Sequence, residues 1–438
     1  MSEPLIPVVV WTVGCRSNQA DREALIAELV QHDLRSSTAE DEALVYIIHS
    51  CCVTAEAERD TRRLVHKARR LNPESKVFVY GCIANYMLSN DYSGYGPWKD
   101  SVILVTHTDP VIFASRIASE LKASHAATSE KIPKKTLPRA VIKIQGGCAR
   151  RCCYCVVPMA RGPGNSLALD MVLDKIEESF QNGSKEIVLT GINLGDWGLD
   201  LMPQSRLDDL LERIQATTSH PEARIRLSSI EPWSVSEKTA SFISKGRPFC
   251  RHLHIPLQAG NEALLERMGR RTDLERVRRI IQGIMAQERL AAVGLDLIAG
   301  LPGESEPSFR KTVEFVESLD VAYLHVFGYS PRKGTRARDM DGQVPKEERK
   351  KRVNELIRLG RKKTEAFLGK NQGREAEVLV TGTYQGKPRG LTDNFIEVLI
   401  DGAKGSKCPK AMEVGELVRI RLTDMGKSGR WMIGHIIS

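Results

Sequence analysis

Ten cysteines are the residues best suited to chemistry in this 438-residue chain, and eight of them fall within its first 155 residues. The tightest group is Cys148-Ala-Arg-Arg-Cys152-Cys-Tyr-Cys155, with thiols spaced by three residues and then by two. Thiolates are the usual protein ligands of iron–sulfur clusters. Three ligands leave one iron of a four-iron cluster open, and an open metal position can bind a substrate or cofactor. The spacing therefore predicts a 4Fe–4S cluster on Cys148, Cys152 and Cys155.

A structural zinc site is the alternative use of this loop. Zinc usually takes four protein ligands, commonly as two close pairs, and Cys153 is the only further thiol nearby. The observed spacing does not form two close pairs. The pattern therefore favours the cluster and leaves Cys153 as a bystander.

A second group of cysteines is dispersed in sequence but regular in position. Cys15, Cys51 and Cys82 each follow a short apolar run typical of a buried strand, at residues 8–13, 44–48 and 76–80. The carboxyl ends of parallel strands share one edge of a sheet, so we expect the three thiols to converge there. They are candidates for a second cluster, with Cys52 a possible substitute for Cys51. The alternative is three unrelated cysteines that pack as small apolar residues.

The elements that must position these cysteines fall into three regions. Residues 1–120 alternate strand-like and helix-like stretches, which predicts an α/β fold with a doubly wound parallel sheet. Residues 121–138, rich in Ser, Thr, Lys and Pro, indicate a linker. Residues 139–366 repeat strand and helix, with one helical pattern over 264–287, and predict a partial (β/α) barrel whose chemistry lies at the carboxyl ends of the strands. Residues 367–438 have short strands and turns typical of a small β-barrel.

Composition limits the class of protein and its location. The net charge of +9 is compatible with a polyanionic partner, although many basic residues will be solvated surface. No apolar run approaches the roughly 20 residues that span a bilayer, and the amino-terminal residues lack a secretory signal pattern. We expect a cytoplasmic protein without a membrane partner.

Several ordered motifs resemble those of the radical S-adenosylmethionine methylthiotransferases. The cysteine loop contains Tyr154 and is followed by Pro158, Arg161 and Gly162. The segments Thr12-Val-Gly-Cys15, Ser50-Cys51-Cys-Val-Thr54 and Tyr80-Gly-Cys82 are similar to that family's amino-terminal domain. Residues 367–438 resemble the RNA-binding TRAM barrel. Further matches follow in the family's order: residues 189–195, 228–232, 252–260, 300–304 and 325–335.

This resemblance implies two clusters with different tasks. The cluster on Cys148, Cys152 and Cys155 would bind S-adenosylmethionine and cleave it reductively into a 5′-deoxyadenosyl radical. The cluster on the amino-terminal cysteines would carry the sulfur that is methylated and transferred to a substrate carbon. The protein's part is to orient these cofactors. An electron donor such as a flavodoxin or ferredoxin is implied, while no sulfur donor is indicated.

The resemblance also suggests contacts to S-adenosylmethionine, although turn formation or strand-end capping explains each residue equally well. They are polar or small residues at expected strand ends: Thr190, Gly191, Asn193, Ser229, Glu231 and Gln258.

Members of this family modify an adenosine beside the tRNA anticodon or a ribosomal-protein aspartate. The basic charge and the TRAM-like region favour tRNA, and residues 191–198 and 325–335 are most similar to enzymes that act on carbon 2 of N6-threonylcarbamoyladenosine at position 37. Isopentenyladenosine is the alternative nucleoside. An RNA-binding protein with structural zinc is the alternative from another class. Candidate contacts to the RNA backbone are Lys370, Arg374, Lys387, Arg389, Lys404, Lys407 and Lys410.

Three positions depart from the family pattern. Gly146 stands where an Asp is common, and His49 replaces a usual Asn. The family commonly has further arginines after Arg-Gly, whereas here Arg161-Gly162 is followed by Pro163-Gly-Asn-Ser. We expect the clusters to tolerate these changes, whereas substrate contacts near Pro163 are the ones affected.

Overall fold

A computed structural model describes residues 6–32, 34–37, 40, 43–90, 102–106, 110–121, 137–401, 412–426 and 428–437. The chain divides into two compact units. Unit 1 comprises residues 1–135, 146–164 and 330–339, and unit 2 comprises residues 136–145, 165–329 and 340–438. Most of the predicted linker, 122–136, lies outside the described residues.

Unit 1 is built on a parallel sheet with strand order β2-β1-β3-β4-β5. Its central strand β3 is fully buried along Val45–Ser50, as a strand covered on both faces must be. Helix α2 has a Thr54 cap that accepts a hydrogen bond from the Ala57 N–H, with acidic residues in its first turn and basic ones in its last. The predicted parallel sheet is confirmed.

The bounds of the unit 1 elements follow chain order. The strands are β1 Ile6–Val13, β2 Leu34–Ser36, β3 Val45–Ser50, β4 Lys76–Tyr80 and β5 Ile103–Val105. The helices are α1 Arg16–Val30, α2 Ala55–Leu71, α3 Cys82–Ser89, α4 Pro110–Glu120, α5 Val157–Arg161 and the short 3-10 turn Arg336–Arg338.

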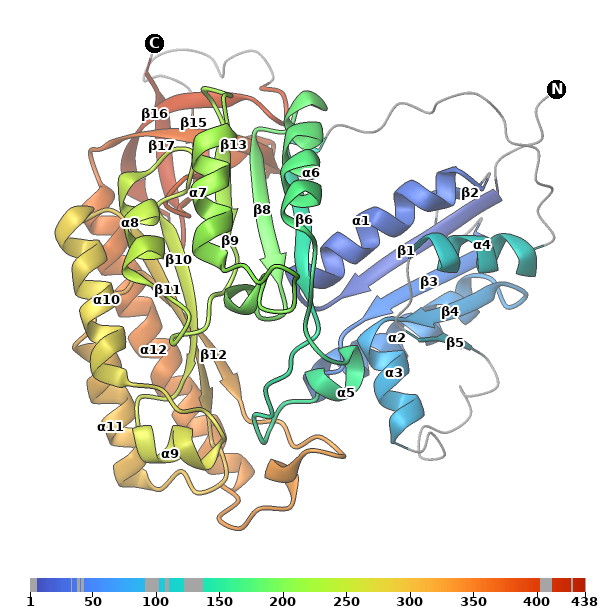
Figure 1. Cartoon of the computed structure of the whole chain (residues 1–438), viewed down its shortest axis with the longest axis horizontal. Helices are drawn as coiled ribbons and strands as arrows, with labels where there is room; N and C mark the ends of the chain where they lie inside the picture. Colours follow the sequence, from blue (N-terminus) through green and yellow to red (C-terminus); the bar gives the residue numbers. More distant parts are fainter. Residues whose placement is uncertain are drawn as a thin grey trace. The chain divides into compact units, whose positions relative to one another are not determined.

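Unit 2 contains a curved series of strands in two sheets, ordered β7-β6-β8-β9 and β10-β11-β12. A bridge between Ile225 and Phe249 links the two sheets. The pairs β6–β8, β8–β9, β10–β11 and β11–β12 are parallel. Helices α10, α11 and α12 run alongside β10–β12 (Figure 1). This is the predicted partial (β/α) barrel.

These elements also have defined bounds. The strands are β6 Arg139–Gly146, β7 Asn165–Ser166, β8 Glu186–Gly191, β9 Arg224–Leu227, β10 His252–Gln258, β11 Ala292–Ala299 and β12 Tyr323–Gly328. The helices are α6 Leu169–Gln181, the 3-10 turn Leu194–Asp196, α7 Leu207–Thr217, α8 Glu237–Lys245, α9 Glu262–Arg267, α10 Leu274–Gln287, α11 Glu306–Glu317 and α12 Lys346–Asn371.

The predicted single helix over 264–287 is wrong, because the structure has α9 and α10 there. Gly269, with φ of +74°, follows the end of α9, and the Asp273 side chain accepts from the Arg276 N–H to begin α10. A left-handed glycine and a new cap therefore override a continuous helical pattern.

The carboxyl-terminal part of unit 2 is a closed barrel with strand order β13-β14-β15-β17-β16. Its apolar core includes Val378, Val398, Ile420 and Met432, and the barrel confirms the predicted β-architecture. The strands are β13 Glu375–Tyr384, β14 Lys387–Thr392, β15 Glu397–Asp401, β16 Leu417–Met425 and β17 Met432–Ile436.

Candidate iron–sulfur and substrate sites

The loop that carries the first cysteine group connects β6 to α5 and closes on itself. The Cys148 N–H donates to the Gly162 carbonyl at 3.0 Å, and the Cys155 N–H donates to the Cys152 carbonyl at 3.0 Å. All three cysteines of the predicted cluster are partly exposed. A backbone fixed at both points and three accessible thiols on one short loop fit the donor set of a 4Fe–4S cluster.

A glycine is required at the start of this loop. Gly147 has φ of +63°, and a Cβ atom there would lie 1.8 Å from the Pro163 carbonyl oxygen. The chain on either side of the cysteines thus meets at Gly147 and Pro163. The departure at Pro163 therefore lies at the base of the cluster loop.

The structure brings the second cysteine group together at the carboxyl ends of β1, β3 and β4. Cys15 caps α1, Cys51 follows β3, and Cys82 is the first residue of α3. Gly14 has φ of +122°, and a Cβ there would lie 2.6 Å from the Cys51 Cβ. Residues that are far apart in sequence therefore meet at one sheet edge.

The electrostatics of this second group favour a bound cation. Burial, together with the neighbouring Cys15 and Cys82 thiols, raises the pKa of Cys51 to about 12. Thiolates that share a site repel one another unless positive charge is bound, so the donor set fits a metal cluster. Cys52 is buried in the apolar core of unit 1, and its hydrogen bond with Cys82, followed by burial, raises its pKa.

Arg161, for which the sequence pattern indicates no role, lies beside the second cysteine group. Its Nε–H donates to the Cys82 Sγ at 2.8 Å, and its Nη2 donates to the Asn18 Oδ1 at 2.7 Å. Both terminal nitrogens lie 3.2 Å from the Asp21 Oδ2. Burial opposes its charge, but Cys82 and Asp21 raise the pKa of Arg161, so the guanidinium remains positive beside the cysteines.

At the carboxyl end of β8 in unit 2, Thr190 is buried and Gly191 packs against Gln145. The Asn193 N–H donates to the Gln145 Oε1 at 2.8 Å. Among the described residues, the buried Asn193 Oδ1 and Ser228 Oγ have no hydrogen-bond partner. Unsatisfied buried polar atoms are costly, so this strand end is suited to a polar ligand.

The other three residues suggested for S-adenosylmethionine have different environments. Ser229 is partly exposed just after β9. The Glu231 carboxylate forms an ion pair with Arg270 at 2.5 Å, so only its remaining lone pairs are available. Gln258 ends β10 with φ of +75°.

The suggested RNA contacts also differ in their surroundings. Lys370 forms an ion pair with Asp320 at 2.6 Å, and Lys387 forms an ion pair with Asp401 at 3.0 Å. Two arginines of the set are exposed: Arg374 and Arg389. Three lysines lie outside the described residues: Lys404, Lys407 and Lys410.

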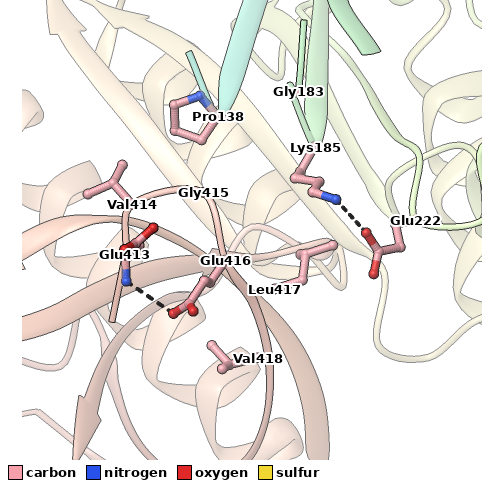
Figure 2. A pocket seen from close by; sticks show the side chains of 10 residues that line it. All are labelled: Pro138, Gly183, Lys185, Glu222, Glu413, Val414, Gly415, Glu416, Leu417 and Val418. Carbon is pink, nitrogen blue, oxygen red and sulfur yellow. Dashed lines mark hydrogen bonds and ion pairs between the residues drawn. The ribbon is translucent and has the colours of Figure 1, made fainter. Parts of the chain in front are cut away.

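A pocket of about 480 Å³ lies at the amino-terminal ends of β6, β8 and β9 (Figure 2). Its charged lining residues are Glu222, Glu413, Glu416 and Lys185, and the lysine is paired with Glu222 at 2.6 Å. Excess negative charge opposes RNA binding. The pocket also lies at the strand ends opposite those that carry chemistry in barrel folds.

Comparison with known proteins identifies the class of this fold and site. The Radical SAM superfamily matches residues 142–316, and a family described as uncharacterized protein family UPF0004 matches residues 7–93. A solved radical S-adenosylmethionine methyltransferase, TsrM from Kitasatospora setae, is similar in fold, with a TM-score of 0.54 at 15% identity over 77% of each chain. The chain is thus a radical S-adenosylmethionine enzyme, with a 4Fe–4S cluster and S-adenosylmethionine as its cofactors.

Curated relatives extend over nearly the whole chain. The threonylcarbamoyladenosine tRNA methylthiotransferase MtaB of Aquifex aeolicus is 30% identical over 94% of this chain and 99% of its own. The MtaB of Rickettsia prowazekii is 30% identical over 94% of each chain. The tRNA-2-methylthio-N(6)-dimethylallyladenosine synthase of Moorella thermoacetica is 29% identical over 97% of this chain and 96% of its own.

The chain therefore belongs to the radical S-adenosylmethionine methylthiotransferase family and is a tRNA-modifying enzyme. Membership disfavours the alternative of an RNA-binding protein with structural zinc. None of the helices within the described ranges is both long and apolar enough to cross a membrane.

Proposed function

We propose that this enzyme adds a methylthio group to carbon 2 of N6-threonylcarbamoyladenosine at position 37 of tRNA. Relatives named for threonylcarbamoyladenosine and for dimethylallyladenosine are almost equally similar, at 30% and 29% identity. Identity alone therefore does not separate the two substrates. The resemblance of residues 191–198 and 325–335 to enzymes that act on N6-threonylcarbamoyladenosine supports the threonylcarbamoyl substrate.

The convergence of Cys15, Cys51 and Cys82 carries the proposal of a second 4Fe–4S cluster. Three strand ends deliver one thiol each, and the buried guanidinium of Arg161 lies beside one of them. When bound, the two clusters supply the electron that cleaves S-adenosylmethionine and the sulfur that is transferred. The chain's own residues hold these groups: Cys148, Cys152 and Cys155 the first, and the amino-terminal cysteines the second.

The remaining assignments complete the proposal. Residues 1–120 form the methylthiotransferase domain, 139–366 the radical S-adenosylmethionine domain and 367–438 a TRAM-like domain that binds tRNA. S-adenosylmethionine is bound by six strand-end residues: Thr190, Gly191, Asn193, Ser229, Glu231 and Gln258. A flavodoxin or ferredoxin reduces the enzyme in the cytoplasm.

Mass spectrometry of tRNA nucleosides tests the substrate. A deletion strain should lose 2-methylthio-N6-threonylcarbamoyladenosine and accumulate its precursor, and the wild-type gene should restore the product. A gene carrying Cys148→Ala, Cys152→Ala and Cys155→Ala should not restore it. Loss of the methylthio-isopentenyl nucleoside instead would favour the alternative tRNA substrate. Unchanged tRNA would favour a ribosomal-protein aspartate.

A further inference from the structure

A continuous chain of polar side chains lies on one face of β10–β12 in unit 2, and the assignments above do not use it. The Tyr323 hydroxyl is 2.8 Å from the His252 Nε2 and 3.0 Å from the His254 Nδ1. The Asp296 Oδ1 is 2.8 Å from the His254 Nε2 and 3.2 Å from the His325 Nδ1. Two of the five, His252 and His254, are buried, and polar groups are costly to bury unless they are hydrogen-bonded.

Strand register places these side chains together. In the parallel pairing of β11 with β12, Gly294 is opposite Tyr323 and Asp296 is opposite His325. Side chains alternate along a strand, so Tyr323 and His325 share one face. A Cβ on Gly294 would lie 2.1 Å from the Tyr323 ring, so this glycine is what admits the tyrosine.

The hydrogen bonds have one consistent direction. Burial disfavours the charged form, but hydrogen bonds from His254 and His325 lower the pKa of Asp296 to about 2, so its carboxylate only accepts. Both histidines therefore donate to Asp296. The His254 Nδ1 then accepts from the Tyr323 O–H, whose oxygen accepts from the His252 Nε2–H.

This series of hydrogen-bonded side chains has a buried end at His252 and a solvent-exposed end at His325. At the buried end, the centroid of the His252 ring lies 4.4 Å from the centroid of the Phe395 ring, which belongs to the small barrel. At the open end, the His325 side chain is 51% exposed and Phe327 is 45% exposed. Among the described residues, no hydrogen bond reaches the His325 Nε2. The open end lies toward the carboxyl end of β12, where barrel enzymes bind substrates.

We propose that His325 and Phe327 form a binding site for the target nucleotide, with His325 contacting a carboxylate-bearing substituent on N6 and Phe327 stacking on the adenine. This inference rests on the proposed function, because threonylcarbamoyl is such a substituent. His325 donates from Nδ1 to Asp296 and, with a proton on Nε2 as well, donates from Nε2 to the threonyl carboxylate. The dimethylallyl group is apolar and offers no acceptor for this hydrogen bond. An exposed aromatic ring suits an unstacked base.

A metal ion is the competing occupant of the same cluster. Two imidazoles and a carboxylate can bind iron or zinc, and the three ligand atoms of His254, Asp296 and His325 lie within 4.8 Å of one another. The 2.8 Å between the His254 Nε2 and the Asp296 Oδ1 is a hydrogen-bond distance. Ligands about 2.0–2.1 Å from a tetrahedral zinc ion would be farther apart. The geometry thus favours an orienting carboxylate over a metal ligand.

Binding of anticodon stem-loops to the full-length, cluster-loaded enzyme tests the site. The loops differ only at N6 of position 37: threonylcarbamoyl, dimethylallyl or no substituent. Fluorescence anisotropy should show the wild-type enzyme binding the threonylcarbamoyl loop about tenfold more tightly than the unsubstituted loop, as a charged hydrogen bond allows. His325→Phe should remove this preference while leaving the unsubstituted loop unaffected. Phe327→Ala should weaken the binding of all three loops by the same factor.

Two further variants keep the test decisive. His220 forms a comparable surface pair with Glu177 at 3.3 Å, so His220→Phe is the matched control and should change nothing. His325→Gln keeps a polar side chain but cannot donate to Asp296 and to the substrate carboxylate in the same way as His325. It replaces His325→Phe in the test if His325→Phe lowers the melting temperature or the cluster absorbance. It should lose most of the preference.

The outcomes separate this inference from the proposed function. If the wild-type enzyme methylthiolates the threonylcarbamoyl loop but His325→Phe retains the preference, the inference alone fails. Equal loss of affinity for all three loops in His325→Phe would overturn it as well. So would one equivalent of zinc or non-cluster iron in the wild-type protein that His325→Phe removes. If the wild-type enzyme modifies only the dimethylallyl loop, the proposed function fails.

Discussion

The Nε–H of Arg161 donates a hydrogen bond to the Sγ of Cys82 at 2.8 Å. Arg161 ends α5, the short helix that follows the Cys148–Cys155 loop, whereas Cys82 begins α3 on the amino-terminal sheet. Both cysteine groups belong to unit 1, and this contact connects the helix that follows the first group to a cysteine of the second group. The guanidinium is also positioned to set the electrostatics of whatever the amino-terminal cysteines bind.

Replacing Arg161 with Gln should lower the reduction potential of the proposed amino-terminal cluster. Reduction adds negative charge, which a cationic donor at a ligand sulfur stabilises, so its loss disfavours the reduced form. A hydrogen bond to a charged group contributes about 1.5–3 kcal/mol, and a tenfold change in a one-electron equilibrium corresponds to 59 mV. The expected shift is on the order of 65–130 mV, measured by potentiometric titration with electron paramagnetic resonance.

The titration should be made in protein that also carries Cys148→Ala, Cys152→Ala and Cys155→Ala, where only the proposed amino-terminal cluster would remain. Arg62→Gln is the matched control, since Arg62 forms a half-exposed ion pair with Glu58 on α2. An equal shift in both variants, or none in Arg161→Gln, would show that the contact with Cys82 does not tune the cluster.

Removing the amino-terminal cysteines should separate the two chemical tasks. The variant Cys15→Ala, Cys51→Ala and Cys82→Ala should retain about four of about eight irons after anaerobic reconstitution, since each cubane holds four. It should still cleave S-adenosylmethionine to 5′-deoxyadenosine, yet yield no methylthiolated tRNA. Retention of all the iron would refute the second cluster. Loss of S-adenosylmethionine cleavage would show that the two sites are not independent.

Thiol spacing and strand-end position allowed both cysteine groups to be proposed from sequence, because both patterns are local or follow from a parallel sheet. The Arg161 contacts with Cys82 and Asp21 were not predictable, since they depend on packing between segments far apart in the chain. The polar chain on β10–β12 was hidden for a related reason. His254, Asp296 and His325 come from three strands, and only their register brings them together.

Gly14→Ala should damage the amino-terminal cysteine site without any change in its thiols. The position has φ of +122°, and a new Cβ would lie 2.6 Å from the Cys51 Cβ, so the Cys15 turn must move. We expect reconstituted iron to fall toward about four per chain. In Gly283→Ala, on α10 with open space around the glycine, iron should be unchanged and stability should rise by about 0.5–1 kcal/mol. Similar iron contents in the two variants would contradict the close approach.

Glu186→Gln should strongly destabilise unit 2. The buried Glu186 carboxylate pairs with Arg139, Arg224 and Arg226 at 2.7, 2.9 and 2.8 Å. Removing one partner of a buried ion pair leaves uncompensated charge and costs about 3–5 kcal/mol. Urea unfolding followed by circular dichroism measures this loss. Glu177→Gln, which removes only an exposed partner of His220, should change the free energy of unfolding by less than about 1 kcal/mol.

The same carboxylate should make stability depend on acid pH. Burial favours protonation, but Arg226, Arg224 and Arg139 hold the pKa of Glu186 well below its usual 4.5. The unfolded chain therefore takes up a proton near pH 4.5 while the folded chain remains ionised. The stability that this group contributes is complete above that pH and is lost as the pH falls toward the folded pKa. The slope from this group reaches at most about 1.4 kcal/mol per pH unit.

Urea titrations between pH 6 and pH 3.5 should show a shallower decline in the free energy of unfolding for Glu186→Gln than for the wild-type protein. Parallel declines would mean that Glu186 has the same pKa in the folded and unfolded chain, so that the three arginines do not change its ionisation.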